Sequence, residues 1–249
     1  MKSILNLIVI CTVMGFASAA LAETVPGSDD WHFDMSKAIA IELADTPAWS
    51  LAMPYLHEIG PKTQDWNILL LQARVELQRG DVKTAQSLIE RALSAHPKNP
   101  RILAMAGNIA ADAGEQDKAV GYFESVLSMQ PDNTQVLMAL GRIRSAQSKW
   151  QDAIDIYQRL LKLTMPTAEI CSRLASACEN TGDLECAEKY LVMNLDIHPN
   201  RALALLPLER FYRRHQKTDK ANDIARELSR YKKNENENRE LRALQKSAK

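Results

Sequence analysis

Two stretches of the chain, 34 residues apart, share one pattern: GNIAADAGEQDKAVGYF at 107–123 and GRIRSAQSKWQDAIDIY at 141–157. Each begins with Gly, carries an Ala at the same place, and ends on an aromatic residue four positions after that Ala. Residues four apart lie on one face of an α-helix, and small residues let a partner helix approach closely. The pattern therefore predicts a hairpin of two helices in each stretch.

The same spacing recurs along most of the chain. The alanine position is filled by Ala85, Ala119, Ala153, Ala187 and Ala221, and the large residue by Ile89, Phe123, Tyr157 and Leu191. The small residue of the first helix is Ala73, Gly107, Gly141 or Ala175, and the turn carries Gly80, Gly114, Ser148 or Gly182. Gly tolerates the left-handed conformation that ends a helix, and a following acid favours the start of the next one. Pro97, Pro131 and Pro199 then end the second helices.

These positions resemble the tetratricopeptide repeat, a helix–turn–helix unit of this period. The resemblance implies an all-α fold, a right-handed α-solenoid whose concave face is lined by the first helices. Five repeats are expected, at 66–99, 100–133, 134–167, 168–201 and 202–235. The fifth departs most, because Glu209 replaces the small residue and Pro207 falls inside the first helix, which predicts a kink or a late start.

The N-terminal segment 1–22 has the anatomy of a secretory signal peptide. Lys2 precedes an apolar run, and Ala20-Leu21-Ala22 forms a small-residue site, so cleavage after Ala22 is predicted. This places the mature protein in a bacterial periplasm, where disulfides persist. The alternative is an uncleaved helix that anchors the protein in the membrane.

The parts outside the repeats are expected to be simpler. Residues 23–30 should form a flexible leader, and 31–65 a degenerate helical hairpin that caps the stack. The charged segment 236–249 either extends the last helix or frays in solvent.

The two cysteines Cys178 and Cys186 stand on either side of the turn at Gly182, comparably far from it. Their side chains can face each other across an antiparallel hairpin, which favours a disulfide; reduced, buried cysteines are the alternative. The spacing also resembles the cysteine-stapled SEL-like repeats. Cys171 lies in the same helix as Cys178 and is expected to be a small buried filler.

The sequence offers no recognisable catalytic or metal-binding constellation. The 5 histidines are scattered, there is no Cys-x-x-Cys pair, and motifs for nucleophiles or phosphate loops are lacking. We therefore expect no cofactor, no metal and no enzymatic activity. The 31 basic residues balance 31 acidic ones, and nucleic acid is not expected as a partner of an exported protein.

The repeats themselves point to protein partners. Members of the resembled family hold peptides in the concave groove, at the second, fifth, ninth and twelfth positions of each first helix. Carried over, these positions give Asn67, Arg74, Arg101, Asn108, Gln135, Arg142, Ser172, Arg210 and Arg213. Arginine at these positions suits carboxylates and backbone carbonyls. The alternative is that these arginines only solvate their helices.

The predicted function is a periplasmic protein–protein interaction scaffold or adaptor for assembly of an envelope, pilus or secretion complex. It would bind a peptide segment or helix of its partner in the groove. The bases that dominate from Arg201 onward add a possible contact with an anionic surface. Alternatives are a glycan- or wall-enzyme-associated accessory module and a hydrolase with an unrecognised site.

Overall fold

A computed structural model describes residues 29–44, 49–59, 63–198 and 201–231. All regular structure within these ranges is helical, so the predicted all-α fold class is confirmed. The chain divides into two compact units, residues 1–133 and 134–249, and each is considered by itself.

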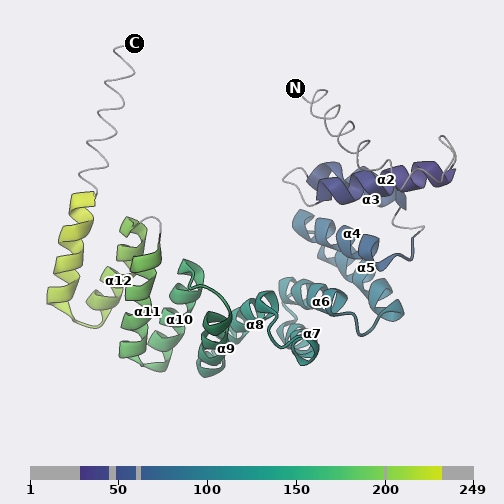
Figure 1. The fold of residues 1–249 in the computed structure, drawn as a ribbon. Helices are drawn as coiled ribbons and strands as arrows, with labels where there is room; N and C mark the ends of the chain where they lie inside the picture. The colour runs from purple at the N-terminus through teal and green to yellow at the C-terminus, as the bar shows by residue number, and fades with distance from the viewer. Residues whose placement is uncertain (1–28, 45–48, 60–62, 199–200, 232–249) are drawn as a thin grey trace, which may run out of the picture. The chain divides into compact units, whose positions relative to one another are not determined.

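The first unit consists of a short hairpin followed by two helical pairs (Figure 1). Its elements are α2 (Asp29–Ala44), η1 (Trp49–Leu51), α3 (Met53–Ile59), α4 (Trp66–Arg79), α5 (Val82–Ala95), α6 (Pro100–Asp112) and α7 (Gln116–Met129). Within each pair the two helices pack against each other. The α4–α5 pair packs against the α6–α7 pair, and α2 and α3 both contact α4. The apolar side chains of α2 and α3 share a core with Ile68 and Val75 of α4.

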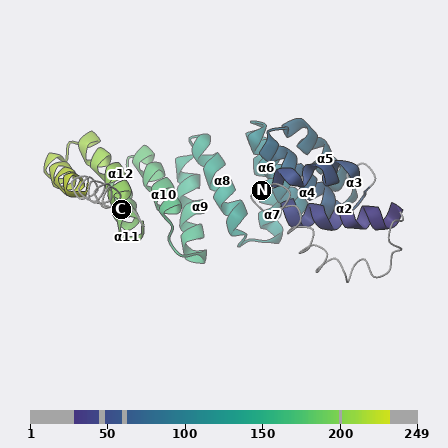
Figure 2. The same cartoon turned by 90° about the horizontal axis from the view of Figure 1, so that it is seen from above.

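The second unit repeats the same arrangement (Figure 2). It contains α8 (Thr134–Ala146), α9 (Trp150–Leu163), α10 (Ala168–Thr181), α11 (Leu184–Ile197) and α12 (Arg201–Arg214), followed by a helix over 218–231. Successive helices α8 to α12 contact each other in chain order. One helical hairpin cannot bury its apolar face alone, so stacking supplies the core.

The recurring alanines form the centre of each pair. Their exposed fractions are 0% at Ala85, Ala119, Ala153 and Ala187 and 1% at Ala221. The large residue four positions later is buried as well in the four pairs from α4 to α11. The sequence period therefore marks equivalent places in one kind of core.

Close approach of the paired helices explains the small residue in the first helix. A Cβ atom added at Gly107 would lie 2.4 Å from Cε1 of Phe123, and one added at Gly141 would lie 2.5 Å from Cε1 of Tyr157. No carbon atoms can approach so closely without displacement. The aromatic ring of each second helix thus lies directly on the glycine of the first.

The turns inside the pairs use the left-handed conformation at a fixed position. The φ angles there are +90° at Gly80, +80° at Gly114 and +83° at Gly182. Ser148 adopts φ 57° in the third pair and Gln216 adopts the same φ in the fifth. The turn therefore keeps the left-handed backbone conformation where another residue replaces glycine, and that residue is strained.

Two helix boundaries differ from the predictions. Helix α2 begins at Asp29, inside the expected leader, because acidic residues stabilise the start of a helix. Helix α12 begins at Arg201 and continues through Pro207, so the late start does not occur, and the alternative, a kink at Pro207, stays a prediction.

The signal segment with its cleavage site and the tail at 236–249 lie outside the described residues, as does most of the expected leader. Among the described helices, none has the length and apolar character needed to cross a bilayer.

Candidate functional site

The nine predicted groove residues all lie on the first helices of the pairs, in two groups. Asn67, Arg74, Arg101 and Asn108 belong to α4 and α6 of the first unit, and Gln135, Arg142, Ser172, Arg210 and Arg213 to α8, α10 and α12 of the second. Eight of them are exposed and Arg74 is half-buried. Their use as a partner site stays a prediction.

In the first unit, two of these side chains already have partners at the start of α4. The Asn67 amide donates to Asp65 Oδ1 at 3.2 Å, and Asp65 also caps α4 by accepting from the Asn67 backbone N–H. The Arg101 guanidinium lies over the Trp66 ring, 5.4 Å from its centroid. Such a cation–π contact holds the arginine over an aromatic surface.

In the second unit, the arginines differ in their surroundings. Arg142 and Arg210, at the same register of α8 and α12, are both exposed. Arg213 forms an ion pair with Glu209 one turn earlier in α12. Glu209, which replaces the small residue of the earlier repeats, therefore serves an intrahelical pair.

A hollow of about 320 Å³ lies between α8, α9 and α10. Its lining comprises Ser145, Trp150, Glu169, Ser172, Arg173, Ser176 and Ala177. Only Ser172 was among the predicted groove residues. The register that gave Ser172 also gives Ser145, Glu169 and Ser176, which were not among the predicted groove residues.

A disulfide joins Cys178 of α10 to Cys186 of α11, with 5.7 Å between their Cα atoms. This is the pairing that the sequence favoured. Cys171 is free and fully buried, as a filler residue should be, and burial raises the pKa of its thiol. The bridge links the two helices across the turn at Gly182.

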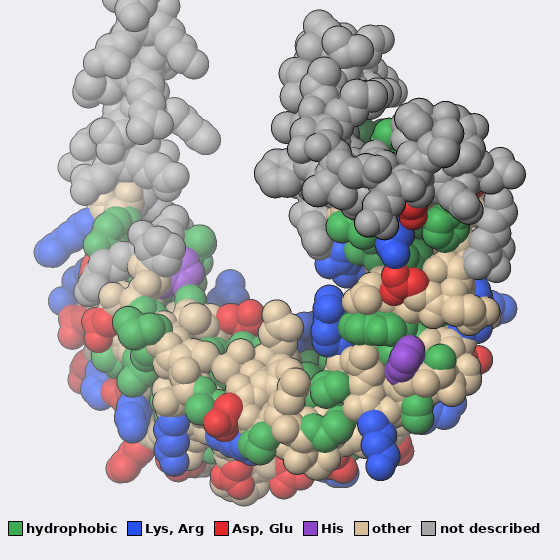
Figure 3. Space-filling view, turned by 45° about the vertical axis from the view of Figure 1, so that its right-hand side comes forward, with side chains coloured by type: hydrophobic (Ala, Val, Ile, Leu, Met, Phe, Trp, Pro, Cys, Tyr) green, Lys and Arg blue, Asp and Glu red, His purple; other side chains and the backbone are tan. Residues whose placement is uncertain are grey.

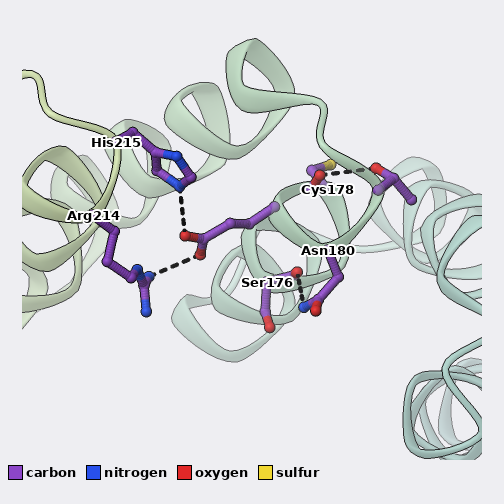
Figure 4. A network of polar contacts seen from close by, with 7 residues as sticks. Ser176, Cys178, Asn180, Arg214 and His215 are labelled. Carbon is purple, nitrogen blue, oxygen red and sulfur yellow. Dashed lines mark hydrogen bonds and ion pairs between the residues drawn. The ribbon is translucent and has the colours of Figure 1, made fainter.

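An ion-pair cluster joins α10 to the end of α12 (Figure 4). Glu179 accepts from Arg214 Nη2 and contacts His215 Nε2, both at 2.8 Å. Asn180 and Thr181 close the end of α10 by bonding backbone carbonyls of Ser176 and Cys178, each at 2.8 Å. The fourth and fifth pairs are thereby tied together by side chains.

A second cluster centres on Glu188 of α11. Its carboxylate accepts from Lys217 Nζ at 2.6 Å, Lys220 Nζ at 2.5 Å and the Tyr212 hydroxyl at 2.9 Å. Burial raises the pKa of Glu188, but these three hydrogen bonds outweigh it and lower that pKa to about 2. Burial and the bond to Glu188 raise the pKa of Tyr212 to about 12.

Several bases of the predicted basic C-terminal surface form ion pairs, and contact of this surface with an anionic partner stays a prediction. Five of its bases are paired with carboxylates: Arg213, Arg214, Lys217, Lys220 and Arg226. On the face drawn in Figure 3, basic and acidic side chains are interspersed.

No group of three His, Cys, Asp or Glu side chains that could hold a metal occurs among the described residues.

Family models of the tetratricopeptide repeat match residues 70–134 and 136–169. No curated protein matches the chain.

Solved structures share the fold at low identity. A tetratricopeptide repeat protein of Parabacteroides merdae ATCC 43184 has a TM-score of 0.65 at 16% identity, covering 79% of this chain and 78% of its own. A MamA structure has a TM-score of 0.60 at 19% identity, covering 66% of this chain and 96% of its own. The structure of MamA residues 41–end from Desulfovibrio magneticus RS-1 has a TM-score of 0.61 at 15% identity, covering 68% of this chain and 96% of its own. The family models thus identify residues 70–134 and 136–169 as tetratricopeptide repeats, and the solved structures show the same fold over a larger part of the chain.

Proposed function

We propose that this protein is a protein–protein interaction scaffold of the bacterial cell envelope, exported to the periplasm. It holds a segment of a partner protein against the first helices of its repeats. The family match supports the scaffold role, and the disulfide between Cys178 and Cys186 is consistent with an oxidising compartment.

The observation that carries the proposal is the contrast between the two sides of the first helices. One side carries the small residues that pack against the second helices, and the other presents long polar side chains at a fixed register. Arg142 and Arg210 occupy the same place in α8 and α12, and both are exposed. Arginines in such an arrangement bind carboxylates and carbonyl oxygens with directional hydrogen bonds.

The proposal is tested by cross-linking in intact bacteria followed by mass spectrometry, using wild type and an Arg142→Glu/Arg210→Glu variant. The variant should lose the main cross-linked partner. A matched control is Arg159→Glu/Arg230→Glu, which makes the same charge change at exposed positions of the second helices. A partner set unchanged in the first variant, or lost equally in both, would contradict a site on the first helices.

Export is tested separately by N-terminal sequencing of the protein recovered from the periplasmic fraction. A mature chain that begins at Glu23 is expected. Recovery of the full-length chain in the membrane fraction would instead support the anchored form.

A further inference from the structure

The hairpin of α2, η1 and α3, here called the cap hairpin, is attached to the repeats mainly through one face of α4 (Figure 1). Ile68 and Val75 of α4 share its apolar core. Gln72 and Glu76 follow Ile68 at four and eight residues along the same stripe of the helix. Polar side chains are therefore interleaved with apolar ones where the cap hairpin meets α4.

Both polar side chains are buried at this joint with an oxygen that lacks a hydrogen bond. The exposed fraction is 1% for Glu76 and 6% for Gln72. Within the described part of the chain, no donor bonds Gln72 Oε1 or Glu76 Oε2. Arg79 Nη1 lies 3.7 Å from Glu76 Oε2, which is too far for a hydrogen bond. A buried acceptor without a donor forfeits the bond that water would give it, so both oxygens disfavour the closed joint.

The later first helices avoid this arrangement at the same two registers. Where a later helix is polar at the register of Glu76, the side chain has a hydrogen-bond partner, as Arg144 and Tyr212 do. The register of Gln72 carries buried apolar residues in every later first helix, namely Ala106, Leu140, Leu174 and Leu208. Among the described first helices, buried oxygens without a donor at these registers therefore occur only at the joint with the cap hairpin.

The polar contacts that cross the joint are partly open to solvent. His57 Nε2 of α3 lies 2.8 Å from Glu76 Oε1, and 53% of the His57 side chain is exposed. Lys37 Nζ of α2 lies 2.7 Å from Oδ2 of Asp65, the residue that caps α4, and about a third of each side chain is exposed. Exposed contacts of this kind add little to stability, because water replaces them readily. Apolar packing is thus the main force that holds the cap hairpin on α4.

We propose that the cap hairpin is a releasable cover, which opens from α4 as a unit while the repeats stay folded. Opening lets water hydrate Gln72 and Glu76, and this offsets part of the apolar contact that is lost. It also uncovers the face of α4 that carries Ile68 and Val75. Elements that move in regulation come from the least stable part of a fold. The inference concerns a conformational change and does not depend on the partner site on the first helices.

Hydrogen exchange of the chain from Glu23 onward, read by mass spectrometry at low urea, tests the opening. The helices α2 and α3 are too short to persist alone, so their amides exchange whenever the cap hairpin opens. In wild type these amides should exchange at least about tenfold faster than the slowest amides of α4 to α7.

Gln72→Leu introduces the residue that α8, α10 and α12 carry at this register, and it removes one unbonded oxygen from the joint. It should slow exchange in α2 and α3 by about tenfold, the equilibrium change expected for one such group. Gln78→Leu makes the same substitution at an exposed position of α4 and is the matched control. It should leave exchange in α2 and α3 unchanged.

His57→Ala is a second variant, at an exposed position, that does not alter the buried side of the joint. It removes the contact to Glu76 Oε1 and should speed exchange in α2 and α3 by about tenfold, while α6 and α7 keep the wild-type rate. It decides the question with the wild-type rates if Gln72→Leu does not fold.

Three results would each overturn the inference. They are exchange of α2 and α3 at the rate of the slowest amides of α4 to α7, equal effects of Gln72→Leu and Gln78→Leu, and no effect of His57→Ala. A negative cross-linking experiment would remove the proposed partner site and leave the releasable cover standing.

Discussion

At the scale of single residues, the repeat tolerates substitution where the backbone permits it. Ser148 and Gln216 stand where other pairs have a left-handed glycine, and both adopt φ 57°. In this conformation a residue with a Cβ is strained by roughly 1–2 kcal/mol. Glycine avoids the strain, but it loses more conformational entropy on folding, so the net difference in stability is smaller.

Ser148→Gly should therefore raise the free energy of unfolding by about 0.5–1 kcal/mol. Urea unfolding followed by circular dichroism measures the change through the midpoint. Gly114→Ser makes the reverse change at the equivalent turn, where no atom lies within 4 Å of an added Cβ, and should lower stability by a similar amount. Equal midpoints for all three proteins would show that the turn carries no strain.

At Gly107, by contrast, the packing of the Phe123 ring leaves no room for a side chain. A Cβ there would lie 2.4 Å from the Phe123 ring, so Gly107→Ala should lower the free energy of unfolding by about 1–3 kcal/mol. Gly121, on the exposed side of α7, has no atom within 4 Å of an added Cβ. Gly121→Ala should raise stability by about 0.5–1 kcal/mol, since alanine favours a helix. The same urea titration tests both, and a shift of the same sign in both variants would refute this account of close helix approach.

At the scale of elements, α11, α12 and the helix over 218–231 are joined by the carboxylate of Glu188. Its pKa of about 2 in the folded protein lies below the ordinary value of 4.5. A lowered pKa contributes stability above the ordinary pKa, and this contribution is lost as the pH falls from about 4.5 towards 2. Lys217 and Lys220 are partly exposed, with 34% and 57% of their side chains accessible, so solvent screening reduces the effect.

Glu188→Gln should lower the free energy of unfolding at pH 7 by about 1–3 kcal/mol, and this difference from wild type should shrink between pH 4.5 and pH 2. Urea unfolding at several pH values measures it. Glu185→Gln, at an exposed position in the first turn of the same helix, is the control and should lower stability at pH 7 by less than about 1 kcal/mol. A difference that stays constant down to pH 2 would show that the carboxylate contributes no charge-dependent stability.

At the scale of the whole molecule, the repeat period was enough to predict the fold class. Ala85 and its equivalents occupy one environment in every pair, so the pattern in the sequence and the packing express the same constraint. Gln216 was missed because glutamine is not a turn residue, although it lies one period after Gly182.

The candidate site was less predictable because it depends on contacts between pairs. Trp150 and Arg173 line the hollow from positions outside the groove register, and only the packing of α9 beside α10 brings them together. The ion pairs of Glu179 and Glu188 likewise connect residues about one period apart. The periodicity of the sequence indicates which face of a helix is buried, but it does not indicate which exposed side chains of neighbouring helices contact each other.

A stack of repeats also predicts how damage spreads. Each pair contacts mainly its neighbours in the chain, so a defect at one end should fade with distance along it. Leu56 of α3 is fully buried in the core that α2 and α3 share with α4, and Leu56→Ala should cost that region about 2–5 kcal/mol.

Hydrogen exchange read by mass spectrometry measures this region by region, because local unfolding exposes only the amides of the helices that open. In the Leu56→Ala variant, protection should fall in α2 to α4, fall less in α5 and α6, and stay at the wild-type level in α10 to α12. Leu208 of α12 is buried as well, so Leu208→Ala is the matched control in the second unit. It should lower protection from exchange in α11 and α12 and leave protection in α4 unchanged. Uniform loss of protection over all helices in either variant would mean that the chain unfolds as one cooperative unit rather than as a row of neighbours.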